Sequence, residues 1–126
     1  MRKPDSADSG ALTLSYVIVF PAVLIALLFI VQAALYFMAH NLALAAAQQG
    51  ADVAREYNST DGAGSAAALS LIRQDGSGML ETERAVATRT DTTVTVTVSG
   101  QAWSLVPGLP VTVNETVQEP IERFVP

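Results

Sequence analysis

The sequence predicts an α+β membrane protein, in which a long N-terminal transmembrane helix continues into an Ala-rich helix. A short second helix and a small antiparallel sheet of about three strands follow. Three observations predict this class: residues 10–51 contain no Lys, Arg, Asp or Glu, the segment up to residue 57 is rich in alanine, and apolar residues alternate from residue 83 onward. The chain therefore divides into a leader (1–9), a long helix (10–57) and a small α+β domain (58–126).

The densest apolar stretch, residues 17–39, is long enough to cross a membrane. A helix rises about 1.5 Å per residue, and about 20 apolar residues cross a hydrocarbon core of about 30 Å. A buried core helix is the other explanation for an uncharged run. About seventy residues remain beyond the long helix, too few to cover it on all sides. We therefore expect a membrane-spanning helix that has the lipid bilayer as its partner.

The charges that flank the apolar run predict its orientation. Arg2 and Lys3 lie just before it, and basic residues resist translocation, so we expect a cytoplasmic N terminus and an extracytoplasmic C-terminal domain. We expect the short polar leader to be disordered. A removable signal peptide is the alternative, because small residues at 43–47 fit its cleavage rule. The apolar run, however, exceeds the roughly 7–15 residues of such peptides.

Two features are expected inside the long helix. Pro21 removes one backbone donor, so we expect a kink or a loosening there rather than an end. Further along, small residues recur four apart and form smooth stripes, which let another element approach closely. That partner is either the chain's own sheet or a neighbouring subunit. The stripes consist of Ala39, Ala43, Ala47 and Ala51, and beside them Ala46, Gly50 and Ala54.

The segment after residue 57 begins with turn-forming residues and a second helix. Residues 57–62 combine Asn, Ser, Thr, Asp and Gly, which indicates a turn. Residues 66–73 then predict a short helix, for which Ser65 is the candidate N-cap.

Three strands are predicted from alternating residues, at 83–90, 93–99 and 111–118. In the second of these, Val94, Val96 and Val98 alternate with threonines, so we expect the valines to face the core. We expect Gly100 to end that strand and Pro120 to end the third. Trp103 is expected to cover the apolar edge of the sheet.

Composition argues against several classes of function. Two of the twelve acidic residues precede the apolar run, which leaves ten acidic residues against five arginines after residue 51, so we expect no nucleic-acid partner. The chain has no cysteine, which removes disulfides and thiolate metal sites. His40 lies on the apolar helix, away from the acidic residues, so no catalytic triad is expected. We expect no catalytic, cofactor-binding or metal-binding residues, and no enzyme activity.

The order of these features resembles the TadE-like family of bacterial tight-adherence (Flp-type) pilus proteins. The resemblance begins at Gly10, runs through Tyr16 and Pro21, and continues over 45–55 and then over 94–98, 106–113 and 122–124. It implies a membrane-anchored structural protein of the cell envelope, a minor pseudopilin-like component of pilus or secretion-system assembly. It also implies other pilus or secretion-system subunits as partners, with homo- or hetero-oligomers formed through the N-terminal helix.

The resemblance further implies a processing site between Gly10 and Ala11. Prepilin-type sequences usually carry a Glu five residues after the Gly, where this chain has Ser15. A buried Glu selects a charged partner in lipid, and a serine cannot. Cleavage therefore stays open, and the alternative is a single-span membrane protein whose extracytoplasmic binding domain is unrelated to pili. The residues with implied assembly or helix-packing roles are Ser15, Tyr16, Pro21, Ala39, Ala43, Ala47, Gly50 and Ala51.

Overall fold

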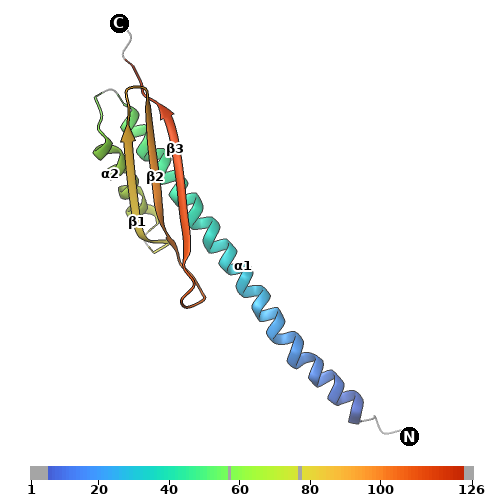
Figure 1. The fold of residues 1–126 in the computed structure, drawn as a ribbon. Coiled ribbons are helices and arrows are strands. Elements are labelled where there is room, and N and C mark those ends of the chain that lie inside the picture. The colour runs from blue at the N-terminus through green and yellow to red at the C-terminus, as the bar shows by residue number, and fades with distance from the viewer. Residues whose placement is uncertain (1–5, 57, 77, 124–126) are drawn as a thin grey trace. The chain divides into compact units, whose positions relative to one another are not determined.

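The computed structural model describes residues 6–56, 58–76 and 78–123. These form the helices α1 (Ser6–Arg55) and α2 (Asp61–Asp75), followed by the strands β1 (Leu80–Arg89), β2 (Thr93–Ala102) and β3 (Val111–Pro120) (Figure 1). The α+β class, the long apolar helix, the short second helix and the three-stranded antiparallel sheet are thereby confirmed. The chain forms two compact units, Met1–Ala33 and Ala34–Pro126, so the C-terminal part of α1 belongs to the same unit as the sheet.

Helix α1 is unbroken from Ser6 to Arg55 and includes Pro21, as expected from the sequence. It begins four residues before the predicted start at Gly10. It ends at Arg55, and residue 57, the predicted end, lies outside the described residues. The hydroxyl of Ser15 donates to the carbonyl oxygen of Ala11 at 3.0 Å, which is a bond back along its own helix.

Helix α2 begins at Asp61, five residues before the predicted start. Its N-cap is Thr60, whose backbone is extended and whose Oγ1 accepts a hydrogen bond from the Ala63 N–H at 3.2 Å. The prediction of Ser65 as the cap is wrong: Ser65 lies inside the helix and donates to the Gly62 carbonyl at 3.2 Å. Gly62 and Gly64 lie in its first turns, and glycine has a low helix propensity. Tertiary packing outweighs that propensity, because Gly64 lies buried against α1.

The sheet has the strand order β1-β2-β3, with both pairs antiparallel. Strand β2 continues past Gly100 to Ala102, so the prediction that this glycine ends the strand is wrong. Gly100 is buried and pairs with Val113, and a Cβ at this position would lie 2.6 Å from Cγ of Leu80. The glycine therefore gives β1 room to pack. Strand β3 ends at Pro120, as predicted.

Strand β1 is longer than predicted at its N-terminal end. It begins at Leu80 rather than at residue 83, and its register with β2 shifts between Glu81 and Arg84. Thr82 lies within this irregularity and has a φ of 50°. A bulge of this kind interrupts the alternation of side chains, which is the pattern that sequence reasoning uses to find a strand.

The core of the C-terminal unit lies between the helices and one face of the sheet. Val94, Val96 and Val98 are fully buried there, which confirms the predicted core face of β2. They share this core with Ile72 of α2 and with alanines of α1. Burying one such aliphatic side chain contributes about 1.5–3 kcal/mol. Trp103 is 51% exposed, and its expected role in covering the apolar edge of the sheet stays a prediction.

Candidate functional site

The N-terminal unit presents a continuous apolar surface. Residues 10–31 are all exposed, although most of them are large and apolar. The helix is long and apolar enough to cross a membrane, and none of its most apolar window is buried. An exposed apolar surface of this extent indicates contact with another apolar phase. One long apolar N-terminal helix thus suggests a single-pass membrane protein. This exposed stretch contains the predicted processing and assembly residues Gly10, Ala11, Ser15, Tyr16 and Pro21.

The small-residue stripes of α1 pack within the C-terminal unit. Their members are all buried, and the residues concerned are Ala39, Ala43, Ala46, Ala47, Gly50, Ala51 and Ala54. At Gly50 a Cβ would lie 2.7 Å from the carbonyl oxygen of Gly64 and 3.1 Å from Cγ1 of Val96. The backbones of α1 and α2 therefore touch at this pair of glycines. Of the two partners that the sequence left open, the structure places the chain's own second helix and sheet on these stripes.

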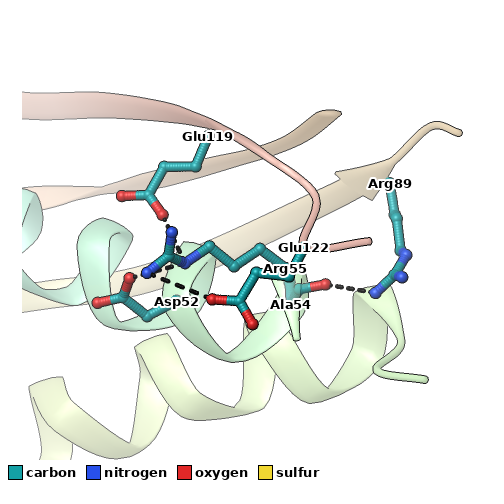
Figure 2. Close-up of polar contacts among 6 residues, drawn as sticks. All are labelled: Asp52, Ala54, Arg55, Arg89, Glu119 and Glu122. Atoms are coloured by element: carbon teal, nitrogen blue, oxygen red, sulfur yellow. Dashed lines mark hydrogen bonds and ion pairs between the residues drawn. The ribbon is translucent and has the colours of Figure 1, made fainter. Parts of the chain in front are cut away.

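Four charged residues join the end of α1 to β3, and we call them the Arg55 cluster: Asp52, Arg55, Glu119 and Glu122 (Figure 2). The Arg55 Nε lies 3.2 Å from Asp52 and 3.1 Å from Glu119, and its Nη2 lies 3.8 Å from Glu122. The Glu122 N–H also donates to the Arg55 carbonyl at 3.1 Å. Because these side chains are partly exposed, each pair contributes about 1 kcal/mol or less. Together they hold the end of β3 beside the end of α1.

Arg89, at the end of β1, caps the C-terminus of α1 (Figure 2). Its Nη1 donates to the carbonyl oxygens of Ala54 at 2.6 Å, Glu56 at 3.1 Å and Ser59 at 3.0 Å. The last carbonyls of a helix have no partner within the helix and carry the negative end of its dipole. The guanidinium group of Arg89 donates hydrogen bonds to carbonyls there and brings a positive charge to the negative end of the dipole. Arg89 therefore holds the end of β1 beside the end of α1.

A second side-chain contact joins α1 to β3, nearer to the start of the strand than the Arg55 cluster. The Nδ1 of His40 lies 2.5 Å from Oε1 of Glu115, and the His40 ring stacks on Tyr36 with centroids 6.1 Å apart. The expectation that His40 lies away from the acidic residues is therefore wrong. His40 precedes Arg55 on the helix, as Glu115 precedes Glu119 on the strand. Strand β3 therefore runs in the same direction as the C-terminal part of α1 (Figure 1).

Sequence reasoning did not identify Arg89, Glu115 or Glu119 as contact residues. A signal was present, because Glu115 and Glu119 occupy the same alternating positions as the apolar residues of β3 that pack on the core. Arg89 likewise continues the series of Ala85 and Ala87 in β1. A charge on the core-facing side of a strand requires a partner. Which helix supplies that partner follows only from the tertiary structure.

The described residues do not assemble a recognisable reaction centre. Among them, no group of three or more His, Cys, Asp or Glu side chains could hold a metal ion. A hollow of about 370 Å³ lies beside the β2–β3 loop and is lined mostly by that loop, with Glu81 on the β1 side. The expectation that the protein is not an enzyme stays a prediction.

The fold and these contacts define a class of protein: an apolar helix suited to a membrane, joined to a small α+β unit. A family model described as TadE-like protein matches residues 10–52 of the 126. The match confirms the resemblance over the apolar part of α1 and most of its alanine-rich part, and it supports assignment of the chain to the TadE-like family. The strands that also entered the resemblance lie beyond the matched segment. No curated protein and no solved structure matches the chain.

Proposed function

We propose that the protein is a membrane-anchored structural component of a Tad-type pilus or secretion system, of the minor pseudopilin-like kind. One observation carries this proposal: the segment that matches the TadE-like model includes the whole stretch of residues 10–31, which is exposed and apolar. In this proposal the bilayer and other subunits of the system cover that stretch. The small-residue stripes are already occupied by the chain's own core. Contacts with other subunits therefore use the larger apolar side chains nearer the N terminus.

The proposed role is structural, not catalytic. The side chains of Arg55, Arg89 and His40 all contact groups of the same chain. Their geometry holds the sheet on the helix, and it offers no nucleophile beside a base. We propose accordingly that the C-terminal unit acts through its surface, as a part of an assembly.

The proposed orientation places the N terminus in the cytoplasm and the sheet outside it. The chain has no cysteine, so single cysteines can report accessibility without background. We expect Gln118→Cys, on the exposed face of β3, to react with a membrane-impermeant maleimide in intact spheroplasts. We expect Ser6→Cys to react only after the membrane is opened. The reverse pattern would overturn the orientation.

The intact mass of the protein purified from membranes tests its processing. A chain that starts at Ala11 indicates pilin-type cleavage despite Ser15, and a chain that starts at Met1 indicates an uncleaved anchor. A start beyond Ala45 would remove the anchor and contradict the proposal.

Participation in a pilus is tested in a bacterium that carries the gene. We expect deletion to reduce surface pili and the full chain to restore them. Restoration should fail when Phe20 and Phe29, both exposed on the apolar stretch, are changed to Asp, because a charge in hydrocarbon is costly. Asn114→Asp, on the exposed face of the sheet, is the matched control and should restore pili. Normal pili in the deletion strain would favour a single-span binding protein unrelated to pili.

A further inference from the structure

The loop between β2 and β3, residues 103–110, exposes apolar side chains at one end of the sheet. Trp103 is 51% exposed, Val106 is 47% exposed and Leu109 is 52% exposed. No charged residue occurs anywhere in residues 101–114. An exposed apolar segment without charges is costly in water, so a contact with an apolar phase is favoured.

The position of the loop follows from the two side-chain contacts between α1 and β3, His40 with Glu115 and Arg55 with Glu119. Strand β3 runs in the same direction as the C-terminal part of α1 and begins at Val111, about 13 Å before Glu115 along the strand. Ala34, where the unit begins, lies about 9 Å before His40 along the helix. The loop before Val111 is therefore at the Ala34 end of the unit. Figure 1 shows it at the opposite end of the sheet from the turn between β1 and β2.

A second segment exposes apolar side chains at this same end. Tyr36, Phe37 and Met38 of α1 are 38%, 61% and 46% exposed. Tyr and Trp are enriched where a protein meets the boundary between lipid and water. Two segments far apart in sequence thus bring an aromatic and apolar surface to the end of the unit where the apolar run enters it. The Arg55 cluster lies at the other end.

We propose that residues 103–110 form a second membrane contact, in which Trp103, Val106 and Leu109 insert into the headgroup–acyl boundary of the bilayer that holds α1. The bilayer is the occupant we favour over a second copy of the chain, because α1 is unbroken through Ala34 and no linker separates the apolar run from this end of the unit. The depth is interfacial, because Glu81 borders the loop and a carboxylate remains hydrated. The inference rests on the membrane anchoring in the proposed function.

The test uses the tryptophan that the chain already has. Trp103 is the single tryptophan of the sequence, so its fluorescence reports the loop alone. The full chain is reconstituted into vesicles whose phospholipids carry bromine at a shallow or a deep acyl position, and a flotation step first confirms that it is bound. We expect quenching relative to unbrominated vesicles, stronger with shallow bromine than with deep bromine. Unquenched emission from floating protein would overturn the loop contact and leave the anchoring intact.

Two variants separate the loop from the rest of the sheet. Val106→Ser with Leu109→Ser keeps the reporter but removes apolar surface, and it should lose about half of the quenching or more. Trp103→Phe with Val86→Trp moves the reporter to the outer face of β1, where Val86 is 53% exposed, and should abolish the quenching. Equal quenching from both reporter positions would overturn the proposal.

A blue shift that depends on protein density, without quenching by bromine, would show a second copy on the loop and would equally overturn it. Failure to float would refute the anchoring itself, together with this inference.

Discussion

The crossing of α1 and α2 at Gly50 and Gly64 makes a quantitative prediction for the variant Gly50→Ala. The new Cβ would lie 2.7 Å from the Gly64 carbonyl oxygen, 3.1 Å from the Ala68 Cβ and 3.1 Å from Val96 Cγ1. Two of these three neighbours are a backbone atom and a Cβ, which move only with their elements. Overpacking of this kind costs about 1–3 kcal/mol, and the gain in helix propensity returns about 0.5–1 kcal/mol. The difference is a net loss of up to about 2.5 kcal/mol in the free energy of unfolding.

The measurement is pulse proteolysis in urea on the full chain in detergent, with the intact C-terminal unit quantified. Gly62→Ala is the matched control, because Gly62 is exposed in α2 and a Cβ there meets nothing within 4 Å. That variant should be neutral or more stable, by up to about 1 kcal/mol. If Gly50→Ala is as stable as Gly62→Ala, the two helices do not touch at this point and the account of the stripes is wrong.

Two further predictions concern the core and the helix cap. Val96→Asp buries a charge where Val96 is fully buried, so we expect the C-terminal unit to become protease-sensitive while the chain stays in the membrane. Thr95→Asp, on the opposite face of β2, should keep its protease resistance. Arg89→Ala removes the donor to three carbonyls and should lower the free energy of unfolding by about 1–3 kcal/mol in urea. The same change at the exposed Arg84 of the same strand should cost less than about 0.5 kcal/mol, and equal losses would contradict the capping role.

The architecture was largely predictable, because it depends on periodicity and composition. An uncharged run of this length forms either a membrane-spanning helix or a buried core helix. The valines that alternate along β2 lie on one face only when the segment is a strand, so they predict a sheet with one buried face. The element boundaries were less predictable where local rules and packing disagree. Gly62 and Gly64 argue locally against a helix, and Gly100 argues locally against a strand. Gly64 and Gly100 nevertheless lie inside a helix and a strand, because a neighbouring element packs where their side chains would otherwise be.

The sequence by itself determined that the chain has a helix suited to a membrane and a small sheet with one apolar face, since both follow from spacing along one segment. Only the tertiary structure decided what covers the alanine stripes and which charges meet. Arg89 reaches Ala54 across 35 positions of sequence, and Arg55 reaches Glu119 across 64 positions. Such pairs leave no local pattern in the sequence. The terminal carbonyls of α1 and the charges on the core-facing side of the sheet find these partners only when the helix and the sheet are packed together.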